Sequence, residues 1–109
     1  MTPKSVIPRE RAQRDIDEAI THYLAEAGAN TALGFIDALQ RAFRHIAQQP
    51  TIGSPRYAYE LGLDGLRVWP LRKYPYLVFY MELETQLDVW RVLHAQREIP
   101  AWVQDPQAP

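Results

Sequence analysis

The sequence of 109 residues contains no cysteine and only three histidines. Without cysteine the chain can form neither a disulfide framework nor a thiolate metal site. The three histidines are scattered along the chain, and this spacing does not favour a zinc site either. We therefore expect a fold stabilised by its own hydrophobic core, and we expect no metal and no cofactor.

Long hydrophobic runs are also absent. No apolar stretch approaches the roughly 20 residues that a transmembrane helix requires, and the N-terminal segment MTPKSVIPRER has no apolar region of the kind found in signal peptides. Hydrophobic residues make up 47% and charged residues 23%, a balance typical of globular proteins. We expect one cytosolic domain over residues 1–109, with an ordered core from about residue 4 to about residue 104.

Neither sign of charge dominates. The formal net charge is −1 and the pI is about 6.3, which argues against a protein whose whole surface binds nucleic acid, because neutralising phosphates requires many cations. The charge is nevertheless uneven, since the two long N-terminal segments carry much of the acid. Basic residues recur in the C-terminal half at Arg67, Arg72, Lys73, Arg91 and Arg97. This distribution predicts a local basic patch.

The first part of the chain is typical of a short strand followed by an amphipathic helix. An edge strand is predicted at Lys4–Ile7. The helix begins at Pro8 or Arg9, since proline is tolerated in a first turn, and ends at Gly28 in a left-handed conformation. Its apolar residues recur at the three- and four-residue spacing of one helical face: Ala12, Ile16, Ala19, Ile20, Tyr23, Leu24 and Ala27.

A second helix follows after a short link, so the two helices are expected to pack as an antiparallel hairpin. Asn30 or Thr31 is its expected cap, and the helix ends before Pro50. Gly34 lies inside it, where glycine costs up to about 1 kcal/mol relative to alanine, so we expect a close packing contact there. Residues 51–65 are dense in turn formers and are predicted to be a loop. The apolar face of the helix contains Ala32, Phe35, Ile36, Leu39, Phe43, Ile46 and Ala47.

Three β-strands are predicted between residues 66 and 94. Leu66–Leu71 is short and apolar, Tyr76–Leu83 is rich in aromatic and β-branched residues, and Leu87–His94 alternates between two faces. One face of this last strand is predicted to carry Leu87, Val89, Arg91 and Leu93. The short links favour antiparallel hairpins. The expected fold is α+β, with an N-terminal strand and an antiparallel helical hairpin packed on a three- to four-stranded antiparallel sheet.

Several segments together resemble a known family. The first helix carries Ala, Asp-Ile, Ile and Tyr at that family's positions in Ala12–Tyr23, and the second begins with A-x-x-F-x-x-A-L at Ala32–Leu39. A P-x-x-G loop follows at Pro50–Gly53. The strands contribute YPYLVFY at Tyr74–Tyr80 and VWRVLHAQRE at Val89–Glu98. In this order and spacing, the chain resembles the RelE/ParE superfamily of type II toxins, and specifically its ParE branch.

The resemblance implies a small cytosolic toxin that a cognate, ParD-like antitoxin neutralises by wrapping around it. ParE-like members poison DNA gyrase by binding, whereas RelE-like members cleave mRNA on the ribosome. RelE-type nucleases use a strand arginine and a C-terminal tyrosine. In this chain the matching strand position falls at Pro75 or Tyr76, and the C-terminal aromatic residue is Trp102, whose indole N–H can only donate. The ParE interpretation, a gyrase inhibitor without catalytic chemistry of its own, is therefore favoured.

Two alternatives stay open. One is a ribosome-dependent endoribonuclease that uses Arg97, the basic turn at Arg72-Lys73 and His94 as the base. The other is a non-toxic module that only binds the antitoxin. A neighbouring antitoxin gene would support either toxin interpretation without separating them.

The candidate contacts with an antitoxin or a target are Arg67, Arg72, Lys73, Tyr80, Arg91, His94 and Arg97. Ordinary structural roles compete with these assignments. Two of the arginines, Arg67 and Arg91, could instead pair with Glu82 or Asp88 across the sheet, and strand aromatics are more often core than contact residues. If one face of the middle strand is left uncovered, its aromatic residues would form an exposed patch for a partner.

Overall fold

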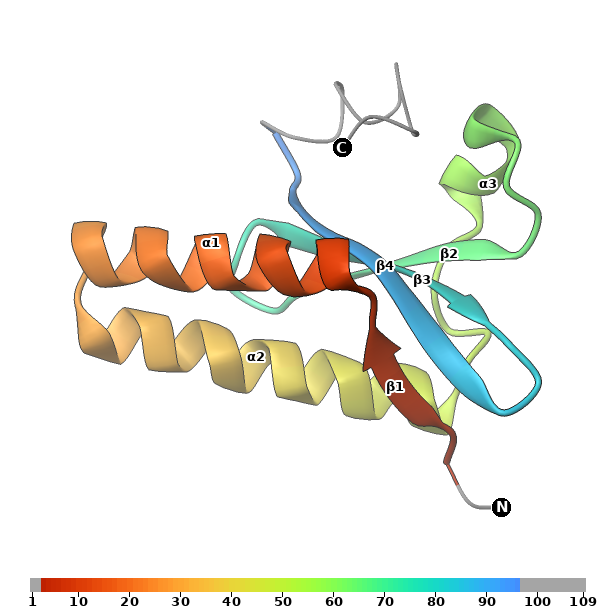
Figure 1. Cartoon of the computed structure of the whole chain (residues 1–109), viewed down its shortest axis with the longest axis horizontal. Helices are drawn as coiled ribbons and strands as arrows, with labels where there is room; N and C mark the ends of the chain where they lie inside the picture. Colours follow the sequence, from red (N-terminus) through yellow and green to blue (C-terminus); the bar gives the residue numbers. More distant parts are fainter. Residues whose placement is uncertain (1–2, 97–109) are drawn as a thin grey trace.

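The computed structural model describes residues 3–96 and shows two helices packed across a sheet, with a third, short helix at the other side (Figure 1). The four strands lie in the order β1-β4-β3-β2. β2, β3 and β4 form an antiparallel meander, whereas β1 pairs with β4 in parallel, so the sheet is mixed. The elements are β1 Ser5–Pro8, α1 Glu10–Glu26, α2 Ala29–Gln48, α3 Arg56–Leu61, β2 Leu66–Pro70, β3 Tyr76–Glu82 and β4 Gln86–His94. The predicted α+β architecture is confirmed.

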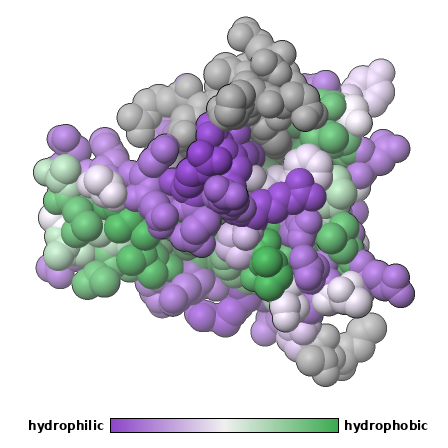
Figure 2. Space-filling view, viewed as in Figure 1, coloured by the Kyte–Doolittle hydropathy of each residue, from purple (hydrophilic) through white to green (hydrophobic). Residues whose placement is uncertain are grey.

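The helical hairpin covers one face of the sheet because both helices are amphipathic. α1 and α2 have 17 and 20 residues, and their buried positions follow the predicted stripes. Figure 2 shows hydrophilic residues gathered over α1 and more apolar residues toward the end of the hairpin at which α1 and α2 are joined. Within residues 3–96, no helix combines the length and the hydrophobicity needed to cross a membrane.

The junction between the helices differs from the prediction in its cap. Gly28 has a φ of 91° and lies between Ala27, which caps α1, and the first residue of α2. No side chain caps α2, and Asn30 and Thr31 lie inside its first turn, so the predicted cap is wrong. Gly28 itself occupies the N-cap position of α2, and its positive φ is one that glycine adopts without a steric cost.

Gly34 forms the predicted close contact. A Cβ atom at this position would overlap the hydroxyl of Tyr74. That hydroxyl donates a hydrogen bond of 2.9 Å to the carbonyl oxygen of Thr31. The missing side chain therefore lets the link between β2 and β3 pack directly on α2.

The segment 51–65, predicted to be a loop, contains the helix α3. It has six residues and too few apolar positions to show helical periodicity. Gly62 ends it in the left-handed conformation, with a φ of 65°. The helix covers the second face of the sheet, where the ring of Tyr57 lies 5.3 Å from that of Phe79. An aromatic patch on this face is therefore not exposed, since Phe79 is fully buried.

The sheet consequently separates two hydrophobic clusters. On β3 the alternation is as expected, with Tyr76, Val78 and Tyr80 facing the helical hairpin and Phe79 facing α3. The hairpin side holds the larger cluster. This arrangement buries the middle strand on both faces.

A β-bulge makes the observed faces of β4 differ from the predicted ones. The register shifts so that Phe79 lies opposite Arg91 while Tyr80 lies opposite Val89, which leaves Trp90 as the extra residue. Val92 therefore joins the hairpin-side cluster, and Leu93 joins the α3-side cluster. The single-face prediction for Leu87, Val89, Arg91 and Leu93 is wrong beyond this bulge, because alternation assumed an uninterrupted strand.

Candidate functional site

Arg67 and Tyr80 together hold the P-x-x-G loop, and neither is a free surface group. Arg67 Nη1 donates to the carbonyl oxygens of Thr51 at 3.2 Å and Gly53 at 2.8 Å. The Tyr80 hydroxyl donates to the carbonyl oxygen of Pro50 at 2.7 Å and accepts from the Gly53 N–H at 3.0 Å. These bonds fix both ends of the loop that follows α2. Arg67 does not pair with Glu82 or Asp88, the partners that cross-strand reasoning suggested.

Tyr80 lies inside the molecule, contrary to its prediction as a contact residue. Its side chain is fully buried, because β3 turns it toward the helical hairpin. Burial raises the pKa of its hydroxyl above 10.0; the Gly53 N–H and Arg67 act in the opposite direction, and Glu82 adds to the rise. A Cβ at Gly53 would lie only 2.6 Å from this hydroxyl. The glycine of the P-x-x-G loop therefore provides the space that the tyrosine needs.

Arg91 forms a buried ion pair with α1. Its Nε and Nη2 donate to the two carboxylate oxygens of Asp15 at 2.7 and 3.0 Å. The same carboxylate accepts the backbone N–H of Val92 at 3.1 Å. Only 11% of the Arg91 side chain and 4% of the Asp15 side chain are exposed. This pair joins the helix to the strand just beyond the β-bulge and gives Arg91 a structural role.

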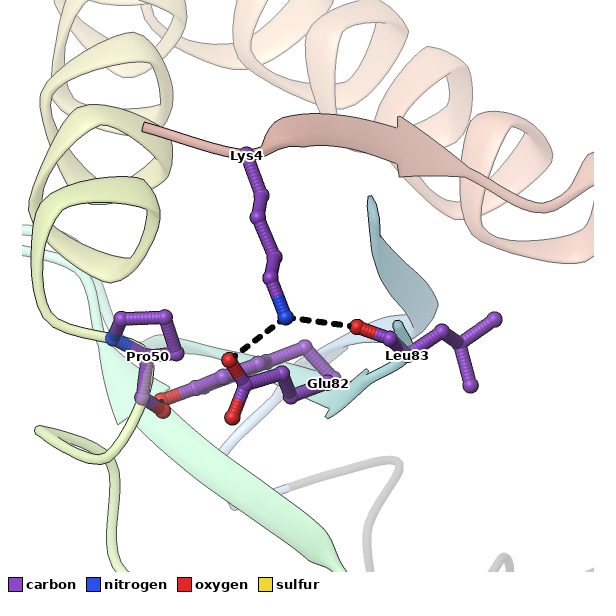
Figure 3. Close-up of polar contacts among 5 residues, drawn as sticks. Lys4, Pro50, Glu82 and Leu83 are labelled. Carbon is purple, nitrogen blue, oxygen red and sulfur yellow. Dashed lines mark hydrogen bonds and ion pairs between the residues drawn. The ribbon is translucent and has the colours of Figure 1, made fainter. Parts of the chain in front are cut away.

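The remaining acidic groups of the sheet are paired with residues near the N-terminus. Lys4 Nζ donates to Glu82 Oε2 at 2.9 Å and to the carbonyl oxygen of Leu83 at 2.8 Å, as Figure 3 shows. Asp88 accepts from Arg9 at 3.1 and 3.2 Å. Sequence reasoning missed both pairs because their members are about 80 residues apart and carry no local pattern. They fasten β1 and the start of α1 to the meander.

Arg72 and Lys73 are the predicted cations that the structure places at the surface. They lie in the turn between β2 and β3, which a bond of 2.9 Å from the Leu71 N–H to the Tyr76 carbonyl closes. Lys73 has a φ of 70°, a conformation that side chains other than glycine rarely adopt. The turn therefore presents both cations at the surface.

This turn borders a groove of about 910 Å³ on α2. Small and apolar residues form part of its lining, and cations lie among them. The sequence analysis singled out Arg72 and Lys73 but assigned no binding role to the α2 residues of this lining. The lining residues are Gly34, Asp37, Ala38, Arg41, Ala42, His45, Trp69, Pro70, Leu71, Arg72, Lys73 and Tyr74.

His94 lies at the end of β4 and is half-buried. Its ring packs edge-on against that of Tyr76, with 5.3 Å between the centroids. Its Nδ1 accepts a hydrogen bond of 3.2 Å from the Gln96 N–H. This bond orients His94 Nδ1 toward the backbone at Gln96. Arg97 and Trp102, the other residues considered for nuclease chemistry, lie outside the described residues.

The described part of the chain offers charge and shape for binding. Residues 3–96 contain no group of three or more side chains suited to hold a metal ion. Arg67 and Arg91 are engaged internally, so the surface cations of the predicted set are those of the turn. Such an arrangement can contact a partner through charge and apolar packing.

The fold is that of a solved toxin–antitoxin protein. A chain of the structure described as "Chromosomal ParDE TA system from P. aeruginosa" superposes with a TM-score of 0.71 at 18% sequence identity. The match covers 85% of the present chain and 97% of that one. At this level of identity the likeness shows the shared fold.

The sequence assigns the family within that fold. Residues 6–99 match the family described as "ParE toxin of type II toxin-antitoxin system, parDE". The chain belongs to this family, and the predicted ParE branch of the RelE/ParE superfamily is confirmed. A comparison with curated proteins finds no match.

Proposed function

We propose that this chain is a toxin that inhibits DNA gyrase by binding and that a cognate, ParD-like antitoxin neutralises it. The observation that carries the proposal is the family match, which extends over residues 6–99 and so over most of the fold. The solved structure with the same fold comes from a ParDE system, which supports the presence of an antitoxin partner. The action requires no covalent chemistry from the toxin.

The arrangement of the predicted cations supports binding as the mode of action. Arg72 and Lys73 are exposed on the turn between β2 and β3, and His94 is partly accessible at the end of β4. With Arg97, these residues are the contacts we propose for a protein partner. Arg67 and Arg91 instead stabilise the framework that carries them.

Two parallel assays test the function. The purified chain is added to gyrase supercoiling and cleavage-complex assays, and to translating ribosomes programmed with a defined mRNA. We expect inhibited supercoiling, intact mRNA, and relief of inhibition when the protein encoded by the adjacent gene is added. His94→Ala is included to test the nuclease alternative, because a loss of mRNA cleavage in a variant with an unchanged circular dichroism spectrum would identify His94 as the base. Cut mRNA beside unaffected gyrase would refute the proposal and favour a nuclease.

A further inference from the structure

The joined end of the helical hairpin leaves apolar side chains in solvent. Leu33 and Leu24 are 62% and 52% exposed, which makes them the two most exposed leucines of residues 3–96. Leu24 lies near the end of α1 and Leu33 near the start of α2, each about one turn from the link at Gly28. Neither leucine belongs to the two hydrophobic clusters of the sheet. Their apolar surface is therefore left unburied by the fold.

Two half-buried isoleucines extend this apolar surface along the hairpin. Ile20 precedes Leu24 by four residues and Ile36 follows Leu33 by three, and residues at these spacings share a helical face. Ile20 and Ile36 pack on the hairpin-side cluster while staying partly exposed. Figure 2 shows the apolar residues that gather at this end of the molecule. We call the surface formed by Ile20, Leu24, Leu33 and Ile36 the hairpin seam.

The hairpin seam lies in a part of the chain with almost no charge. No lysine or arginine occurs in residues 15–40, and Glu26 is the only acidic residue in residues 19–36. Glu26 follows Leu24 by two residues, which places it about 200° away around α1. Binding to a lipid surface or to nucleic acid depends on cations. The seam therefore suits the apolar surface of a protein.

A second copy of this chain provides such a surface. In a two-fold dimer the same patch faces itself, so a charged patch would repel its copy, whereas an uncharged apolar patch is self-complementary. The formal net charge of −1 also puts little long-range repulsion between two copies. We propose that two chains associate through their hairpin seams, so that α1 and α2 of both copies pack together as four helices. This association requires neither gyrase nor an antitoxin.

Sedimentation velocity of the purified chain tests the dimer. Its weight-average mass should rise from 12.6 kDa toward twice that value over about 1–500 μM, because so small an apolar interface gives a Kd on the order of tens of micromolar. Leu33→Glu places the same charge in the seam of both copies and should weaken the association at least about a hundred-fold. Leu33→Lys should have the same effect. Circular dichroism checks that both variants keep the fold.

A mixture of the two variants provides the control for misfolding. The Leu33→Glu and Leu33→Lys proteins should each be monomeric, and they should form a dimer when mixed, because opposite charges then meet in the interface. Tyr59→Glu is the matched control for added surface charge, since Tyr59 is 94% exposed on α3, outside the seam. It should leave the mass at every concentration as in the wild type.

Several distinct results would refute the proposed dimer. A mass of 12.6 kDa at every concentration would show that two copies do not associate. Dimerisation of Leu33→Glu with the wild-type affinity would place the contact elsewhere on the chain. A monomeric wild type whose binding to the protein encoded by the adjacent gene is weakened by Leu33→Glu would assign the seam to that protein instead. None of these results bears on gyrase inhibition, which the supercoiling assay measures separately.

Discussion

Replacement of Tyr80 by phenylalanine tests how the loop after α2 is held. The change keeps the buried ring and removes only the hydroxyl, which donates to the Pro50 carbonyl at 2.7 Å and accepts from the Gly53 N–H at 3.0 Å. Gly53 is buried, so its N–H would be left without a partner. An unsatisfied buried polar group costs about 1–3 kcal/mol. For the two backbone groups together we expect a loss of about 2–4 kcal/mol in the free energy of unfolding.

Urea unfolding, followed by circular dichroism and tryptophan fluorescence at pH 7, measures this loss. Tyr59→Phe is the matched control, because the Tyr59 side chain is 94% exposed and its hydroxyl is free to bond to water. That variant should unfold within about 0.5 kcal/mol of the wild type. A similarly small effect of Tyr80→Phe would refute the reasoning, since the loop would then be stable without the hydroxyl.

The same hydroxyl predicts a dependence of stability on pH. Burial raises the pKa of Tyr80 in the folded chain above 10.0, the value expected in the unfolded chain. Its stabilising contribution is therefore fully present below pH 10 and is lost as the pH rises from there through the folded pKa. Tyr80→Phe should show a shallower loss of stability above pH 10 than the wild type. The same dependence of the free energy of unfolding on pH above pH 10 in the two proteins would contradict this prediction.

Two further substitutions probe the packing of the helices. Asp15→Ala removes the partner of the buried Arg91 guanidinium and should lower the free energy of unfolding by about 3–5 kcal/mol, whereas Asp17→Ala on the exposed face of α1 should cost less than about 1 kcal/mol in the same urea titration. Gly34→Ala should lower the melting temperature because its Cβ overlaps the Tyr74 hydroxyl. Tyr74→Phe should recover part of that loss, and strictly additive effects in the double variant would argue against the contact.

Local sequence patterns predict most of the helices and strands of this fold. Periodic apolar residues gave α1 and α2, and the three strands of the meander were expected within a residue or two of their observed ends. α3 was not predicted, because six residues are too few to show a helical period. It packs on the apolar face of β3 around Phe79, a contact that no local pattern indicates.

The candidate site was predictable only in part. Arg72 and Lys73 lie in a turn that the sequence marks clearly, and they are exposed as a contact surface requires. The α2 side of the groove was not predicted. Polar residues such as Arg41 and His45 are equally expected on a helical face that only contacts solvent. The turn and the helix lie next to each other because Gly34 admits Tyr74.

What the sequence by itself determined is therefore the two long helices, the strands and the family. Only the tertiary structure decided how the charged and polar groups are paired. Arg91 bonds Asp15 across 76 residues, and Tyr80 bonds Pro50 across 30. Periodicity states which face of an element a residue occupies, but one inserted residue at Trp90 reverses the faces of Val92 and Leu93. Partners at such separations are selected by the packing of helices on the sheet, which no local pattern encodes.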